Sequence, residues 1–229
     1  MYKFIKITFE NKFYNNEPNS LLNELIDSTI GGDWGKDSPQ DNYISEVYCV
    51  RGADLPYMEY GSLGKSPVRY ILEKNKNNKE LSDGNIIVEI SGGSPTQSTG
   101  RTAYITKQIL DSYDKPLLCT NFCRAVKTKN KIYSPYVYMI FKIAYEKGLF
   151  FNYENGTTGI KNLNLNSILD YMEIYIASEE EVKDFYNFFT TIFNKISQNS
   201  KENEYLEQLR DTLLPKLING EIDLDKIEI

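Results

Sequence analysis

The feature that most constrains this chain is residues 178–222, where apolar side chains recur in alternating steps of three and four. The recurring positions are 182, 185, 189, 192, 196, 199, 203, 206, 210, 213 and 217, a heptad seam of about five repeats. Ser178 and Glu181 have the spacing of a capping box, which starts a helix. About 40 helical residues form a rod roughly 60 Å long. Because such a rod cannot bury its own apolar stripe, the sequence predicts that it pairs with a partner.

The middle of this seam is polar, from position 197 to position 204. Asn199 and Asn203 occupy seam positions there, and a polar seam residue fixes the register and orientation of paired helices. We therefore hypothesise that these two asparagines set the register. The alternative is a helical hairpin that turns at residues 197–200. Pro215 has no N–H to donate to Asp211, so the helix is expected to kink or end near Leu214.

The net charge of −6 belongs to this helical segment. Residues 178–229 hold 6 Lys/Arg against 12 Asp/Glu, whereas residues 1–177 hold 20 of each. Within the neutral part, residues 115–147 carry seven basic side chains against one acidic one, and residues 65–79 form a second basic cluster. Ordinary solvated faces produce such runs as well as nucleic-acid-binding surfaces do, so charge alone leaves both interpretations open.

Histidine is absent, which removes the commonest base for a Ser or Cys nucleophile and the commonest metal ligand. The three cysteines, Cys49, Cys119 and Cys123, lack a further pair that would complete a zinc site, so they are interpreted as free and buried. We expect neither a metal nor a cofactor on this chain. The odd cysteine count, without a signal peptide or an apolar run long enough to span a membrane, predicts a cytoplasmic protein with no membrane partner.

Residues 1–177 are expected to form a strand-rich body with a few helices. Alternating β-branched and aromatic residues predict a strand at 43–50, and an apolar run predicts another at 86–90. Shorter strands are expected at 104–106, 116–120 and 121–127. Ser134 and Pro135 start a helix that Gly148 stops. Residues 20–26 fit a short helix or a strand entry, and residues 74–84, rich in lysine and asparagine, are expected to form an exposed connection.

Two loops are rich in glycine and hydroxyl side chains, at residues 91–102 and 155–160. The first lacks the Gly-Lys-Ser/Thr spacing of a nucleotide-binding P-loop. It offers backbone N–H groups, hydroxyls, Gln97 and Arg101, which are groups that contact phosphates and base edges in DNA. A long hairpin loop with ordinary turn chemistry is the alternative.

Several ordered motifs resemble the target recognition domains in the DNA-specificity subunits of type I restriction–modification systems. They are Gly31-Gly32-Asp33-Trp34-Gly35, Arg51-Gly52-Ala53-Asp54-Leu55, Ile90-Ser91-Gly92-Gly93-Ser94 with Thr99-Gly100-Arg101-Thr102, Thr120-Asn121-Phe122 and Gly156-Thr157-Thr158-Gly159-Ile160. The end of the long helix is similar to the family's conserved pattern Leu-Leu-Pro-x-Leu-x-x-Gly-Glu-Ile, which residues 213–222 match. The resemblance spans nearly the whole chain.

The resemblance implies a half-length specificity subunit. A full subunit of that family carries two recognition domains and two long antiparallel helices, and each domain reads one half of a split target. This chain has one of each: a recognition domain at 1–177, a long helix for spacing and dimerisation at 178–218 and a tail at 219–229. The fold class is therefore α+β, with a long C-terminal helix that pairs as an antiparallel coiled coil. The expected pairing residues are Val182, Phe185, Phe189, Ile192, Ile196, Leu206, Leu213 and Leu217.

The resemblance also implies a non-catalytic subunit that binds double-stranded DNA and pairs with a second copy of itself or with another half-subunit. DNA methyltransferase subunits would be recruited and would carry S-adenosylmethionine, with restriction/translocase subunits as optional partners. The chain has neither an Asn-Pro-Pro-Tyr-like methyltransferase motif nor a P-loop. The DNA-binding candidates are Arg51, Lys65, Arg69, Ser94, Gln97, Ser98, Thr99, Arg101, Thr102, Arg124, Lys127, Lys129, Thr157 and Thr158.

Two alternatives stay open, one within DNA binding and one from another functional class. One is a free-standing DNA-binding or decoy protein that competes for the methyltransferase without directing it. The other is a helical adaptor whose globular part binds protein. Affinity for DNA that falls steeply as salt rises would favour either DNA-binding interpretation over the adaptor.

Overall fold

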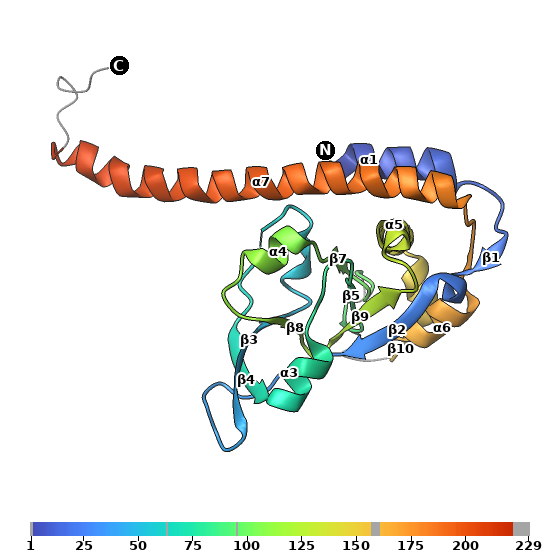
Figure 1. The fold of residues 1–229 in the computed structure, drawn as a ribbon, viewed down its shortest axis with the longest axis horizontal. Helices are drawn as coiled ribbons and strands as arrows, with labels where there is room; N and C mark the ends of the chain where they lie inside the picture. The colour runs from blue at the N-terminus through green and yellow to red at the C-terminus, as the bar shows by residue number, and fades with distance from the viewer. Residues whose placement is uncertain (1, 63, 95, 157–160, 222–229) are drawn as a thin grey trace.

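The computed structural model describes residues 2–62, 64–94, 96–156 and 161–221, which form an α+β body and one long helix (Figure 1). This helix, α7 (Glu179–Ile218), begins after Ser178, whose side chain accepts from the Glu181 N–H while the Glu181 carboxylate accepts from the Ser178 N–H. The predicted capping box is therefore confirmed. The helix is uninterrupted over 40 residues, so the hairpin alternative is wrong.

The helix does not end near Leu214, because α7 continues through Pro215 to Ile218. A proline inside a helix removes one hydrogen bond, here the one that the Asp211 carbonyl would accept. Every side chain in this part of the helix is exposed, so water can replace the missing donor. The turns after Pro215 keep their own bonds, among them Asn219 N–H to the Pro215 carbonyl at 3.0 Å.

The body is built on a four-stranded antiparallel sheet in the order β2-β9-β5-β7. These strands are β2 (Ile26–Gly31), β9 (Cys123–Thr128), β5 (Ile86–Glu89) and β7 (Thr102–Tyr104). In β5, Ile86 and Val88 face one hydrophobic core and Ile87 faces another. Burial on both faces explains why this strand is a continuous apolar run, as the sequence predicted.

A second sheet has the order β4-β3-β8, with β3 (Tyr43–Val50) antiparallel to β4 (Val68–Leu72) and parallel to β8 (Leu117–Cys119). The strand predicted at residues 43–50 is confirmed. The short helices α2 (Leu55–Met58) and α4 (Lys107–Asp111) also belong to this half of the body.

Residues 74–84 are not only an exposed connection, because α3 (Glu73–Lys79) forms there. Two side chains of this helix are tied to the glycine-dense turn that follows β2. Asn75 Nδ2 donates to the Asp33 carboxylate at 2.7 Å, and Lys79 Nζ donates to the Gly32 carbonyl at 2.9 Å. These tertiary bonds hold a segment whose local sequence has no apolar face.

The N-terminal residues, to which no sequence pattern assigned a structure, form α1 (Tyr2–Phe9) and a π-helical turn (Glu10–Tyr14). They pack on α5 (Ser134–Glu146) and on the first half of α7 (Figure 1). The contact is aromatic: the Phe9 ring lies 4.9 Å from Tyr136 and 5.1 Å from Phe185. The start of the chain thereby closes the core that α7 covers.

The expectation that α7 has no partner inside the chain is wrong for its first half. Val182, Phe185, Phe189 and Ile196, all expected to pair with a second copy, are buried in the core of the body together with Phe193. The reason is that α1, α5 and β7 supply the apolar surface that this stripe needs. From Lys201 to Glu221, by contrast, every residue is exposed, including Leu206, Leu213 and Leu217 (Figure 1). We call residues 201–218 the free arm.

The remaining elements are short. β1 (Ser20–Leu21) pairs with β12 (Glu173–Ile174), which follows α6 (Leu165–Tyr171). A three-stranded sheet contains β10 (Glu154–Asn155), β11 (Lys161–Leu163) and β6 (Ser91–Gly92). Turns of 3-10 helix span Leu22–Leu25, Lys131–Tyr133 and Leu149–Tyr153. Among the described residues, no helix combines the length and apolarity needed to cross a membrane.

Candidate nucleic-acid interface

The glycine-rich motifs of the sequence meet at one edge of the two sheets. Because β3 and β8 are parallel, their ends at Val50 and Cys119 lie side by side. In the other sheet, β9 starts where its two antiparallel neighbours end, since Glu89 of β5 is opposite Cys123 and Gly31 of β2 is opposite Arg124. The segments that follow β2, β3, β5 and β8 therefore converge.

Their convergence forms a cavity of about 440 Å³, which we call the motif pocket. Its wall carries two exposed aromatic side chains, Trp34 and Phe122, beside the amide of Asn121. The lining residues are Trp34, Arg51, Gly52, Ala53, Glu89, Ser91, Thr120, Asn121 and Phe122. The pocket thus combines flat apolar surfaces with polar groups from four separate motifs.

One glycine is required by a close backbone approach, and another lies against a buried side chain. A Cβ on Gly32 would lie 1.9 Å from the Thr120 carbonyl oxygen, which leaves no room for any side chain. A Cβ on Gly52 would lie 2.3 Å from Glu89 Oε1. These contacts explain why glycine recurs in the motifs: it lets the strand ends touch, and the pocket forms between them.

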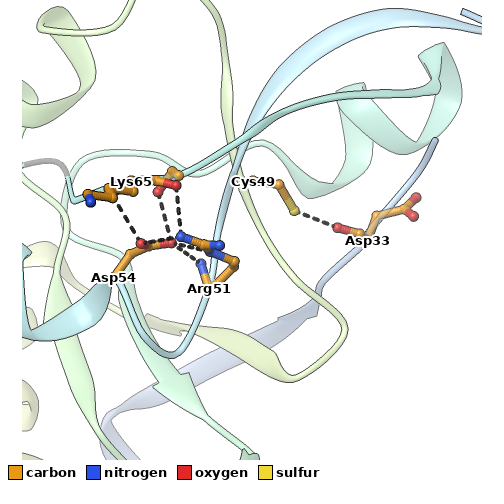
Figure 2. A network of polar contacts seen from close by, with 6 residues as sticks. Asp33, Cys49, Arg51, Asp54 and Lys65 are labelled. Atoms are coloured by element: carbon orange, nitrogen blue, oxygen red, sulfur yellow. Dashed lines mark hydrogen bonds and ion pairs between the residues drawn. The ribbon is translucent and has the colours of Figure 1, made fainter. Parts of the chain in front are cut away.

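Arg51 is held by Asp54 in a network that Figure 2 shows. Its Nε and Nη2 donate to the two carboxylate oxygens at 2.9 and 3.0 Å, and Nη2 also donates to the Lys65 carbonyl at 2.8 Å. The Lys65 N–H and the Ser66 hydroxyl donate to the same carboxylate. Beside this network, the Cys49 thiol donates to the Asp33 carbonyl at 2.9 Å.

The charge state of Asp54 follows from this network. Burial alone would raise the pKa of the Asp54 carboxyl, but the hydrogen bonds from Arg51 and from the Lys65 backbone outweigh burial and hold that pKa below its usual range. Arg51 therefore positions the loop that presents Lys65, and its guanidinium is already occupied within the chain.

Arg69 and Arg101 are also committed to the fold. Arg69 is buried, stacks on the Trp34 ring at 4.1 Å, donates to the Trp34 carbonyl at 2.8 Å and pairs with Asp37. Arg101 donates through Nε to the buried Glu89 carboxylate at 2.9 Å. In this structure they brace Trp34 and Glu89 at the motif pocket, and contact of either arginine with DNA stays a prediction.

The first glycine loop is more closed than the sequence suggested. Ser98, Thr99 and Thr102 are buried, and base contact by these three candidates stays a prediction. Gln97 is exposed and donates to the Tyr145 hydroxyl at 2.9 Å, while the Ser94 hydroxyl accepts from the Gln97 N–H at 3.1 Å. Among the described candidates of this loop, Gln97 is exposed, and Ser94 and Arg101 are half-buried.

The strand that follows the second glycine loop lies beside the first loop, because β11 pairs with β6 and Lys161 is opposite Gly92. Its strands are also linked by the Ser91 hydroxyl, which donates to the Asn162 amide oxygen at 2.8 Å. The candidates Thr157 and Thr158 lie outside the described residues. The structure thus brings the flanks of both loops to the same side of the motif pocket.

The exposed basic candidates lie along β9 and in one loop. Arg124, Lys127 and Lys129 are exposed on β9 and just after it, starting at the pocket edge where Arg124 is opposite Gly31. Lys127 is 3.4 Å from the exposed Asp27 carboxylate, and Lys65 is exposed on its loop. Among the described residues, no ion pair engages Arg124. We call Arg124, Lys127 and Lys129 the basic strand.

Three residues of this surface, Trp34, Asn121 and Phe122, were not among the sequence candidates. The available signal was their position inside glycine-bearing motifs: an aromatic side chain next to a tight turn is held at the surface. Within the part of the chain that the structure describes, no three His, Cys, Asp or Glu side chains are grouped to hold a metal ion.

Comparisons with known proteins point to one family. No family model matches the chain. Over 65 residues, 28% of this chain, it is 45% identical to the specificity subunit of the type I restriction enzyme HindI from Haemophilus influenzae, of which the match covers 14%. Its fold matches the type I restriction–modification S subunit from M. genitalium, with a TM-score of 0.55 and 16% identity over 89% of this chain and 46% of that one.

A second solved structure, which concerns complex assembly and conformational transition of the type I R-M system, matches with a TM-score of 0.52 and 12% identity. This match covers 93% of the present chain and 50% of the chain in that solved structure. The chain therefore spans about half the length of the structures it matches. The resemblance to type I specificity subunits and the predicted α+β fold with a long C-terminal helix are both confirmed.

Proposed function

We propose that this chain, which has the fold of half a type I S subunit, is a DNA sequence-specificity subunit of a type I restriction–modification system. The observation that carries the proposal is the convergence of the recognition motifs on the motif pocket, next to the exposed basic strand. The similarity to a curated specificity subunit supports it. The chain supplies recognition, and catalysis belongs to its partners.

On DNA, the basic strand and Lys65 would contact phosphates and set the position of the duplex. Gln97, Ser94 and Asn121 present amide and hydroxyl groups that can read base edges. Trp34 and Phe122 offer apolar faces in the same pocket. One chain would thereby read one half of a bipartite target.

The second half-site requires a second recognition domain. The free arm offers an exposed row of leucines through which two copies, or this chain and another half-subunit, would pair as antiparallel helices. The pair would recruit DNA methyltransferase subunits, which carry S-adenosylmethionine, and restriction/translocase subunits would complete the complex. The length of α7 would then set the distance between the two recognised half-sites.

The deciding experiment is coexpression with the neighbouring methyltransferase, followed by mapping of methylated adenines across a genome. We expect methylation at one bipartite sequence, with the two halves related by symmetry if the pair is a homodimer. Methylation that is absent or unrelated to sequence would reject the proposal and favour a decoy that competes for the methyltransferase.

A binding experiment tests the surface itself. Lys127→Ala should lower the slope of log affinity against log salt by about one and weaken binding to all sequences, since one phosphate contact is lost. The matched control is Lys107→Ala, since Lys107 is an exposed lysine on α4, which packs near α7 at the other end of the body (Figure 1). Equal slopes for both variants would place the DNA on another face. No affinity at low salt for the wild type would favour a protein-binding adaptor.

A further inference from the structure

The motif pocket is lined by two aromatic side chains that the fold keeps exposed. Phe122 is 57% exposed, although its backbone carbonyl accepts from the Ile90 and Ser91 N–H groups at 2.8 and 3.2 Å. Trp34 is 38% exposed, and the Arg69 guanidinium stacks on its ring at 4.1 Å. Side chains that are anchored before a ligand arrives lose little conformational freedom when they bind it. The pocket therefore presents prepared apolar surfaces to a flat ligand.

A buried carboxylate also lines this pocket. Glu89 is 3% exposed and accepts from Arg101 Nε at 2.9 Å and from Arg101 Nη2. An ionised carboxylate has about four acceptor positions, so the two Arg101 donors leave acceptor capacity unused. A Cβ on Gly52 or on Gly92 would lie 2.3 or 2.8 Å from Glu89 Oε1, so glycine at both positions keeps side chains off the carboxylate. Glu89 can therefore accept a hydrogen bond from a ligand in the pocket.

The amide of Asn121 adds a donor to this acceptor. Asn121 is exposed and lines the pocket beside Phe122, and in the described part of the chain no hydrogen bond engages its side chain. Adenine and cytosine carry an amino donor next to a ring-nitrogen acceptor on the edge that pairs in a duplex. A carboxylate together with an amide N–H matches that edge, whereas thymine has no amino group to donate to Glu89.

The recessed position of these groups favours a base that has left the helix. Within a duplex, neighbouring bases cover the faces of each base, and the grooves offer only its edges. Aromatic side chains stack on bases that are unstacked from their neighbours. The cavity of about 440 Å³ is also within the size range of small-ligand pockets. Apolar walls with a recessed polar group are typical of a pocket that takes an extruded base.

We propose that the motif pocket binds one unstacked adenine or cytosine of the DNA target, stacked against Trp34 and Phe122 with its amino group on Glu89. This rests on the proposed function and names the chemical group that the pocket takes. Asn121 donates to the ring nitrogen beside the amino group. Arg124, exposed two residues after Phe122, contacts the phosphate next to the extruded nucleotide. Recognition at that position of the half-site then depends on how easily the base leaves the helix.

Fluorescence of Trp34 reports on the pocket directly, because Trp34 is the one tryptophan in the sequence. A base that stacks on the indole ring should quench its emission until the pocket is full. The probes are duplexes with the half-site returned by methylation mapping, in which each base in turn is placed opposite an abasic site. At one position, an adenine or a cytosine, the unpaired base should quench most strongly and bind at least about tenfold more tightly, because no base pair has to be broken.

Substitutions on both partners test the contacts. Thymine at the responsive position should lower the affinity at least about tenfold, because the donor to the Glu89 carboxylate is lost. Asn121→Ala should reduce this preference over thymine. Phe122→Ala should weaken binding of the unpaired duplex at least about fivefold, since base–aromatic stacking is lost. The matched control is Tyr171→Ala, which changes a side chain on α6 that is 72% exposed and does not line the pocket.

The outcomes separate this proposal from the proposed function. Binding of the target duplex with unchanged Trp34 emission, or equal affinity at every abasic position, would overturn the base pocket and leave the specificity subunit intact. Equal affinity for thymine at the responsive position would overturn the pairing with Glu89. Quenching by free deoxyadenosine or deoxycytidine monophosphate at lower concentrations than by the duplex would assign the pocket to a free nucleotide instead. No binding of any duplex at low salt would overturn both proposals.

Discussion

The Asp54 network gives the sharpest test of how the motif pocket is held. Asp54→Ala removes a carboxylate whose side chain is 2% exposed and which accepts from the Arg51 N–H, Nε and Nη2, the Lys65 N–H and the Ser66 hydroxyl. Breaking a buried ion pair costs about 3–5 kcal/mol. The Arg51 side chain is 39% exposed and can be rehydrated, so we expect the lower end, about 3 kcal/mol.

For a chain of this size each kcal/mol shifts Tm by roughly 2–4 °C, so thermal unfolding should show a loss of roughly 6–12 °C. Affinity for DNA should also fall, because the loop that presents Lys65 loses its anchor. The control is Asp170→Ala, which changes an exposed residue of α6. A Tm for Asp54→Ala within a degree or so of the control would refute the reasoning that this carboxylate holds the loop.

Four further outcomes are expected. The pKa of Asp54 in the folded chain lies below its ordinary value of 3.8. The charged carboxylate therefore stabilises the fold fully above pH 3.8, and this stabilisation is lost as the pH falls through the folded-state pKa. The difference in Tm between wild type and Asp54→Asn should accordingly narrow below about pH 4. Phe189→Ala in the core should cost about 3–5 kcal/mol, whereas Leu209→Ala on the free arm should leave the Tm of dilute protein unchanged. A thiol reagent at pH 8 should label no cysteine until denaturant is added, since burial raises the pKa of Cys49 to about 12. Phe122→Ala should weaken DNA binding with little change in Tm, because the ring is 57% exposed.

Local features were the ones that the sequence predicted well. The capping box at Ser178, the strand at 43–50 and the helix that starts at Ser134 and stops at Gly148, whose φ is +72°, all depend on residues within a turn or two of each other. The glycine motifs likewise marked the segments that form the pocket. Their partners could not be read from the sequence, because the close approaches of Gly32 to Thr120 and of Gly52 to Glu89 join different strands.

The candidate arginines also separate what the sequence predicts from what only the folded chain shows. Arg51, Arg69, Arg101 and Arg124 were candidates from the sequence; Asp54 is only three residues from Arg51, yet only the folded chain brings Asp37 to Arg69 and Glu89 to Arg101. An arginine at a glycine-rich motif has the same local sequence whether it braces a loop or faces solvent. Among the described residues, Arg124 is exposed and no ion pair engages it.

The sequence alone determined where the long helix starts and that it is periodic, since capping and a seven-residue repeat are encoded locally; that it is uninterrupted to Ile218 is seen only in the structure. Tertiary structure decided what that helix contacts. Aromatic side chains distant in the sequence, on α1 and α5, cover its first half, whereas the free arm is exposed. The physical reason is that a periodic apolar stripe specifies burial but not the surface that buries it: that surface exists only once distant segments of the chain have packed together.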